Sequence, residues 1–485
     1  QGKRAGRPFA PSLPSALPGP QWLEGPRRVM VGINAIAAMG NDDDDYEEDN
    51  EGEMYDDGDD SGDGDSDEGS MDSDAGDEEV DEEEGEDEDG GSRSKFKPPT
   101  AEELEVLRDG AQSAELALFT MQVDETIKEN TPDYASEKEL ESALHALKGI
   151  LESLPEQKVD PAKEAPGFFT ALGLSPPSSL AFKPPASVAV VGSYLPRMAA
   201  LPAPAVDLAM EMSRDMFHEK DFLNYKYHGK RAVFLAVVAR HLAKHKAFAA
   251  VEVMSLRGDP AKPYLSITPE TASPTAFTIR LLPSLAPNAF PMAKLAPARN
   301  CVRRQAEGAA AAPTPVYNAS VIEDMLLEEH TRVIHAAVGE CAGLAGAAVL
   351  LRVWAAQRGF TAAPDAPGGF ALSTLLVRLL QQGKVASYMT PPQILRVALG
   401  VLADPKAFSK TQALARDAAE GLPPPPEPKA FAAAAPSGAT LVDASGWCNV
   451  LAGVSAAAMT ETREAAKRTL AILQHPKDAA EAFHS

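Results

Sequence analysis

A glycine-serine turn followed by an acidic strand is the part of this sequence whose residues could do chemistry. Gly192 and Ser193 follow the apolar run 187–191, and Asp207 lies in a second apolar run at 206–212. Nucleotidyl transfer uses two divalent metal ions held by carboxylates, and a Gly-Ser turn leaves room for the triphosphate. Residues i and i+2 of a strand share a face about 6.7 Å apart, so two carboxylates at that spacing can hold one metal pair. The pattern therefore requires a second acid at residue 209.

That second carboxylate is missing. Position 209 holds Ala209, and the next acid along the strand is Glu211. Glu211 is on the same face as Asp207 but about 13 Å away by the strand rise, too far to replace the missing ligand unless a bulge intervenes. The sequence thus predicts a relic nucleotide site with no catalytic residue and no metal, made of Gly192, Ser193 and Asp207.

A third carboxylate would be expected on a later strand of such an enzyme. The apolar run 276–282 carries Arg280 and no acid, and Glu252, in the run 249–256, is the nearby acidic residue. An active enzyme remains the alternative if Glu211 or Glu252 completes the metal site with Asp207. A third reading is nucleotide binding without turnover at Gly192 and Ser193.

The elements that must position these residues can be predicted from apolar patterning. Strands are predicted at 187–191, 206–212, 249–256, 263–268 and 276–282, and a helix in the second half of 219–245. Together they indicate an α/β domain over 156–310. Residues 311–485 read almost entirely as helices. Thr100 with Glu103, and Ser136 with Glu139, have capping-box spacing, which predicts a helical hairpin over 100–155.

Charge is distributed unevenly along the chain. The whole chain has a formal net charge of −26, but residues 41–90 contain 30 Asp and Glu and no Lys or Arg, which leaves +4 for the rest. Residues 1–99 are rich in Pro, Gly and acids, a composition that favours disorder. The acidic tract is either a solubilising segment or a docking tail for basic partners, and the remainder of the chain is mildly basic.

Several other classes of protein are disfavoured. Three widely spaced cysteines without CxxC spacing point to a reducing compartment and away from a zinc module. His241 and His245 have a metal-binding spacing but lack a neighbouring Glu or a third ligand, which favours surface histidines. The apolar run 342–351 is about half the length that spans a bilayer, and Glu340 and Arg352 flank it. We therefore expect no cofactor, no membrane and no small-molecule substrate.

Two basic clusters are candidates for RNA contact, because Lys and Arg neutralise phosphates and Tyr stacks on bases. The alternative for the first cluster is a solvated helix face with tyrosines packed beneath it; Arg240, Lys244 and Lys246 follow it. The first cluster contains Lys220, Tyr225, Lys226, Tyr227, Lys230 and Arg231, and the second contains Lys294, Arg299, Arg303 and Arg304.

Longer stretches of sequence resemble one family. Residues 190–198, 206–212, 217–239, 290–303 and 313–326 are similar to the nucleolar RNA-associated protein (Nrap) family, a component of the small-subunit processome. Residues 350–360, 368–385 and 391–403 are similar to that family's helical domain, which resembles the helical half of poly(A) polymerases and oligoadenylate synthetases. The resemblance covers about residues 100–485. The family has two tandem units of this kind, and we expect only the first here.

The resemblance implies a degenerate nucleotidyltransferase-like mixed sheet with flanking helices, then an all-helical domain, in an α+β fold. It also implies a nuclear, nucleolar scaffold in small-subunit rRNA precursor processing. The implied partners are pre-ribosomal RNA and processome proteins, including an Rrp-type protein, the UTP-C subcomplex and casein kinase II. The alternative function is an active template-independent RNA nucleotidyltransferase that uses Asp207 and a displaced carboxylate.

Overall fold

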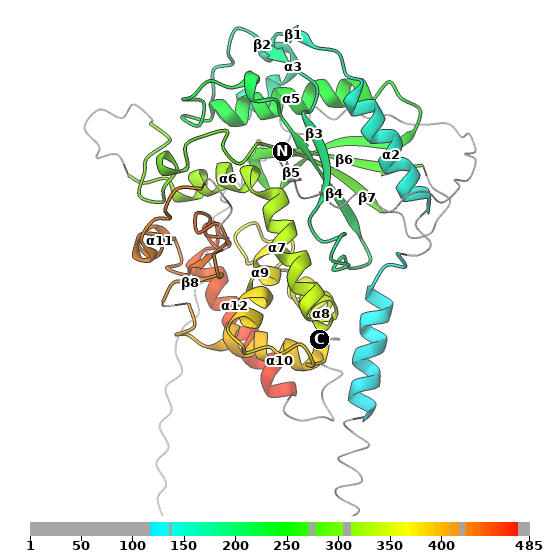
Figure 1. Cartoon of the computed structure of the whole chain (residues 1–485), viewed down its shortest axis with the longest axis vertical. Coiled ribbons are helices and arrows are strands. Elements are labelled where there is room, and N and C mark those ends of the chain that lie inside the picture. Colours follow the sequence, from blue (N-terminus) through cyan, green and yellow to red (C-terminus); the bar gives the residue numbers. More distant parts are fainter. Residues whose placement is uncertain are drawn as a thin grey trace, which may run out of the picture. The chain divides into compact units, whose positions relative to one another are not determined.

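The computed structural model describes residues 117–134, 138–270, 277–303, 312–408, 410–416 and 422–473. The tail at 1–99 and the helix starts expected at Thr100 and Ser136 lie outside these residues. Within them, a mixed sheet with flanking helices is followed by a helical part, so the expected α+β class is confirmed (Figure 1).

A five-stranded mixed sheet forms the centre of the α/β part. Its strands lie in the order β3-β4-β7-β6-β5, with β4 and β7 parallel and the other neighbours antiparallel. Each strand coincides with one of the apolar runs that predicted it, within a few residues. The bounds are β3 Ser187–Val191, β4 Ala205–Glu211, β5 Phe248–Leu256, β6 Asp259–Pro269 and β7 Thr278–Ser284.

Helix α5, Lys226–Leu242, is buried on nearly all sides because it lies between the sheet and a second layer of short elements. Only four of its 17 residues are not buried. The β1 and β2 strands of this layer pair with each other and were not predicted, since each has three residues. The layer consists of β1 Gln157–Val159, α3 Pro161–Glu164, α4 Pro166–Ala171 and β2 Leu180–Phe182, and α2 Lys138–Glu152 precedes it in the chain. Two 3-10 turns follow later, Arg214–Met216 and Met292–Lys294.

The helical part has an apolar core of its own, built around the fully buried Trp354. Helix α6 precedes this core and packs instead into the core of the sheet, through Val321 and Ile322. The helices are α6 Pro315–Met325, α7 Leu327–Glu340, α8 Gly343–Gln357, α9 Gly369–Gln381, α10 Pro391–Ala403, α11 Pro428–Ala434 and α12 Ala456–Leu473, and β8 Gln412–Ala413 pairs with β9 Leu441–Val442.

The helical hairpin expected over 100–155 differs from what the described residues form. Residues 117–130 are helical, and their Phe119 and Val123 pack into the core of the helical part. In α2, Leu147 and Leu151 pack into the core of the sheet instead. The two helices therefore serve different cores. Among the described residues, no single helix is both long and apolar enough to cross a membrane.

Candidate functional site

The carboxylate of Asp207 is held by an arginine on the neighbouring strand. The parallel register of β4 and β7 places Arg280 directly opposite Asp207. Arg280 donates from Nε to Oδ1 at 2.5 Å and from Nη2 to Oδ2 at 2.8 Å, which is a two-bonded ion pair. The Asp207 side chain is 10% exposed and that of Arg280 is 32% exposed. Both carboxylate oxygens thus face a fixed cation.

The negative charge of Asp207 stabilises the charged form of Arg280. Burial lowers the pKa of Arg280, but the charge of Asp207 and its hydrogen bonds outweigh that effect and raise the pKa above the usual arginine value. The guanidinium therefore stays charged, and it lies against the oxygens that a metal ion would need.

The side chain at position 209 is apolar, and so are the side chains that surround it. Ala209 is 1% exposed and lies in register with Leu282 of β7. These two residues and Val191 form a small buried apolar cluster.

The two alternative carboxylates do not converge on Asp207. Glu211 accepts a hydrogen bond from Ser187 at the far end of β4, with Oγ and Oε2 3.0 Å apart. Glu252 lies in the same cross-strand row as Asp207 but three strands away, since it pairs with Ser266, which pairs with Arg280. Three strand spacings are about 14 Å. No cluster of three or more His, Cys, Asp or Glu occurs among the described residues. The donor set therefore does not fit the metal pair of a nucleotidyltransferase.

The Gly-Ser turn lies directly on the carboxylate of Asp207. Gly192 has φ +74°, and a Cβ built on it would lie 2.4 Å from Oδ2 of Asp207. Only glycine combines this conformation with such a close approach. The N–H of Gly192 donates to Oγ1 of Thr331 at 2.8 Å, so α7 holds the turn in place. The predicted proximity of Gly192 to Asp207 is thus present, although Arg280 now completes the arrangement.

A second arginine, Arg352, lies near this pair. In the sequence, its position in an apolar helix is the one feature that marks it. Arg352 of α8 is partly buried, and its pKa is lowered by burial and then by the nearby charge of Arg280. Gly369, at the start of α9, would place a Cβ 3.2 Å from both Nε and Nη2 of Arg352. The chain therefore positions a cation at the N-terminus of α9.

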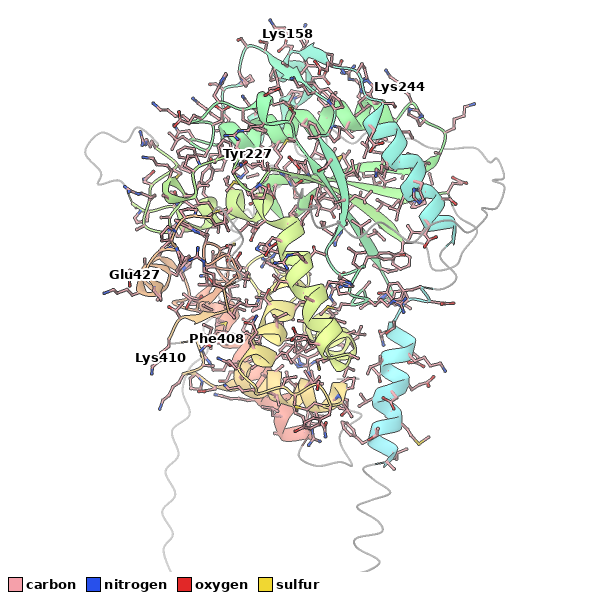
Figure 2. The ribbon with its side chains drawn as sticks, viewed as in Figure 1. Lys158, Tyr227, Lys244, Phe408, Lys410 and Glu427 are labelled. Carbon is pink, nitrogen blue, oxygen red and sulfur yellow. The ribbon has the colours of Figure 1, made fainter. Side chains whose placement is uncertain are left out.

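Two of the RNA-contact candidates are core residues, which corrects that expectation. Tyr227 and Arg231 are 0% exposed, and both donate to Oδ2 of Asp324, at 2.7 and 3.1 Å. Lys262 forms an ion pair with the same carboxylate at 3.1 Å. Figure 2 shows Tyr227 inside the α/β part, whereas Lys244 lies at its periphery. These side chains tie α5 and β6 to α6 and have no surface for RNA.

Lys230 is also engaged within the fold. Its Nζ donates to Oδ2 of Asp221 and to the carbonyl of Met216, at 2.7 and 2.6 Å. Arg240, which follows the cluster, forms an ion pair with Glu164 at 3.1 Å. His241 contacts the carbonyl of Val237 through Nδ1 at 2.9 Å.

The other described candidates are exposed, apart from the half-buried Tyr225, and they lie on two loops that contact each other. The N–H of Asn224 donates to the carbonyl of Cys301 at 2.8 Å, and Oδ1 of Asn224 accepts from the N–H of Arg303 at 2.6 Å. Clusters that are about 70 residues apart in sequence thus form one surface. We call it the basic loop pair: Lys220, Tyr225, Lys226, Lys294, Arg299 and Arg303. Arg304 lies outside the described residues.

Comparisons with known proteins agree with this arrangement of parts. Two models of one family match the chain, Nrap protein domain 1 over residues 166–340 and the Nrap protein PAP/OAS-like domain over residues 343–485. Nucleolar protein 6 of Mus musculus is 31% identical over 400 residues, which cover 79% of this chain and 34% of that relative. U3 small nucleolar RNA-associated protein 22 of Saccharomyces cerevisiae is 26% identical over 324 residues, 59% of this chain and 26% of the relative.

The chain spans about a third or less of the length of these curated relatives. Among solved structures, the Cid1 poly(U) polymerase bound to Mg and 3'-dATP is 11% identical, with a TM-score of 0.46, covering 75% of this chain and 98% of that chain.

Proposed function

The chain belongs to the Nrap family, and on this premise we propose that it is a non-catalytic scaffold in nucleolar ribosome biogenesis. One relative is named Nucleolar protein 6, and the other is named for its association with the U3 small nucleolar RNA. Both names indicate that this chain is located in the nucleolus, within the nucleus. Its role there is in the small-subunit processome, during processing of the small-subunit rRNA precursor.

The ion pair of Arg280 with Asp207 is the observation that carries the non-catalytic part of this proposal. A metal ion needs the carboxylate oxygens that Arg280 already contacts at 2.5 and 2.8 Å. Ala209 supplies no replacement ligand, and Glu252 is three strands away. The nucleotidyltransferase-like sheet is retained as a shape that positions surface residues.

RNA and protein binding form the other part of the proposal. The basic loop pair is the surface assigned to pre-ribosomal RNA, because its Lys and Arg side chains are exposed and its loops are fixed by Asn224. Processome proteins are the other partners, among them the UTP-C subcomplex and casein kinase II. The acidic tract 41–90 contains 30 acidic residues, so its negative charge would attract basic partners.

Primer extension tests the absence of catalysis. Purified full-length chain is incubated with each nucleoside triphosphate, Mg²⁺ or Mn²⁺, and a labelled single-stranded RNA, with an active poly(U) polymerase in parallel. We expect no added nucleotide. Extension that Asp207→Ala abolishes would establish the enzymatic alternative and end the scaffold proposal, whereas extension unchanged in Asp207→Ala would indicate a contaminating polymerase.

A further inference from the structure

Two arginines from separate elements lie near the carboxylate of Asp207, and a third lies beside the start of α9. Arg280 comes from β7 and Arg352 from α8, while Arg257 comes from the tip of the hairpin between β5 and β6. Asp207 pairs with Arg280. Arg257 donates from Nη2 to the carbonyl of Ala366 at 2.7 Å. The local balance is positive, in a region that would hold metal cations in an active enzyme.

Adjacent glycines at the start of α9 let two of these guanidiniums approach the helix backbone. A Cβ on Gly368 would lie 3.4 Å from Nε of Arg257, and a Cβ on Gly369 would lie 3.2 Å from Nε and Nη2 of Arg352. No side chain caps the N-terminus of this 13-residue helix. Its first N–H groups and the helix dipole therefore add to the positive potential of both arginines.

Arg352 and Arg280 each keep donors for a ligand. Among the described residues, Arg352 has no hydrogen bond or ion pair, and it is only partly buried. Arg280 uses Nε and Nη2 on Asp207, so Nη1 is left on a side chain that is 32% exposed. Asp207 attracts Arg352 as well as Arg280, so one carboxylate serves two guanidiniums. A partly buried pair of cations that shares one carboxylate is costly to the fold unless a further anion neutralises it.

We propose that Arg352, Arg280 and the uncapped first turn of α9 bind a phosphate group without a metal ion. Guanidinium groups and helix N-termini both favour phosphoryl oxygens, which accept several hydrogen bonds at once. The phosphate belongs either to the backbone of single-stranded RNA or to a free nucleotide. This site goes beyond the scaffold role and rests on its premise that Arg280, and not a metal ion, holds Asp207.

The first experiment measures the thermal midpoint of the full chain with and without pyrophosphate, in EDTA. Any ligand that binds only the folded state raises the midpoint. We expect pyrophosphate to raise it for the wild type and for Arg214→Gln, a matched removal of charge from an exposed arginine in the 3-10 turn Arg214–Met216. Arg352→Gln should bind pyrophosphate about tenfold more weakly or worse, because it lacks a charge-assisted hydrogen bond to the anion.

Folding of the variant is tested in the same measurement. Without pyrophosphate, Arg352→Gln should unfold cooperatively with a midpoint close to that of the wild type, because it loses both the repulsion by Arg280 and the attraction of Asp207. An equal pyrophosphate shift in Arg352→Gln would overturn the proposal. So would a shift that requires Mg²⁺ and disappears in Asp207→Asn, since that result describes a metal site.

Two further titrations identify the source of the phosphate. If pyrophosphate displaces labelled single-stranded RNA from the wild type but not from Arg352→Gln, the site takes an RNA phosphate. If ATP in EDTA binds in an Arg352-dependent manner and RNA is not displaced, the site takes a nucleotide. Failure of Arg352 dependence in both titrations would remove the anion site and leave the scaffold proposal standing, which primer extension tests separately.

Discussion

Arg280 performs at the residue scale what metal ions perform in a nucleotidyltransferase: it supplies positive charge next to Asp207. Unlike a metal ion, it is tied to β7 and cannot leave with a product. It also directs its charge at the carboxylate in a fixed plane, with two bonds of 2.5 and 2.8 Å. The pair thus gives Asp207 a fixed counter-charge that belongs to the chain itself.

The close fit of Gly192 on Asp207 gives a stability prediction. In Gly192→Ala, the alanine would have to adopt a left-handed backbone conformation, and its Cβ would lie 2.4 Å from Oδ2 of Asp207. Gly173 has a similar φ, +59°, but nothing within 4 Å of its Cβ position. We expect Gly173→Ala to lower the free energy of unfolding by about 1 kcal/mol and Gly192→Ala by about 2 kcal/mol more.

Urea denaturation of the two variants measures this difference. The excess cost at Gly192 should largely disappear when Asp207→Ala is added, because the two changes act on the same pair of side chains. An equal decrease in unfolding free energy for Gly192→Ala and Gly173→Ala would contradict the prediction. It would mean that the turn can move away from Asp207 without loss of stability.

At the scale of elements, each large strand and most helices were predicted, because apolar runs and helical spacing are local properties. Their pairing was not. Arg280 meets Asp207 only because β4 and β7 are parallel neighbours, although 73 residues separate the two. Tyr227 and Arg231 were assigned to a surface because β1 and β2, part of the layer that covers α5, are too short to be detected. Arg352 was noted only as a flanking charge.

The packing of α5 against α6 gives a prediction of pH dependence. His228 is fully buried, its Nε2 lies 3.1 Å from Oγ of Ser320, and Nδ1 has no partner among the described residues. Burial lowers its pKa to about 3, an effect that Asp324 opposes and that Arg231 and Lys262 reinforce. In the unfolded chain the same side chain titrates near 6.5.

The unfolded chain therefore binds an extra proton between these two pKa values, and stability falls as the pH decreases below about 6.5, by up to about 1.4 kcal/mol per pH unit. We expect His228→Gln to reduce the decrease in unfolding free energy between pH 7 and pH 5, measured by urea denaturation. His218→Gln, on a side chain that is not buried, should leave that decrease unchanged. If the wild type and both variants show the same pH dependence of the unfolding free energy, the prediction that folded His228 is neutral is wrong.

At the scale of the whole molecule, the net charge of −26 hides a mildly basic remainder outside residues 41–90. The RNA binding that we propose therefore requires a surface on which cations gather, which the net charge of the chain does not reveal. The basic loop pair joins two segments that the sequence presents separately, and Asn224 supplies the hydrogen bonds that unite them. Sequence composition could show that cations are available, but only the fold shows which of them share a surface.

Salt titration of RNA binding tests this surface. Lys226→Gln with Arg303→Gln should weaken binding to single-stranded RNA and reduce the slope of log K against log salt by about 1.4, or about 0.7 for each phosphate that is no longer neutralised. Lys244→Gln with Lys246→Gln removes the same charge from exposed residues beyond α5 and should leave the slope unchanged. Equal effects of the two double variants would show that only net charge matters.

The apolar cluster around Ala209 opposes the introduction of a second carboxylate on β4. Restoring a carboxylate at 209 would bury a charge against Val191 and Leu282, and Arg280 would still hold Asp207. Replacing Arg280 alone would leave Asp207 without its cation beneath the turn of Gly192. Each of these single substitutions is thus expected to cost stability without creating a pair of carboxylates for metal ions. A two-metal site on this sheet would require several simultaneous substitutions.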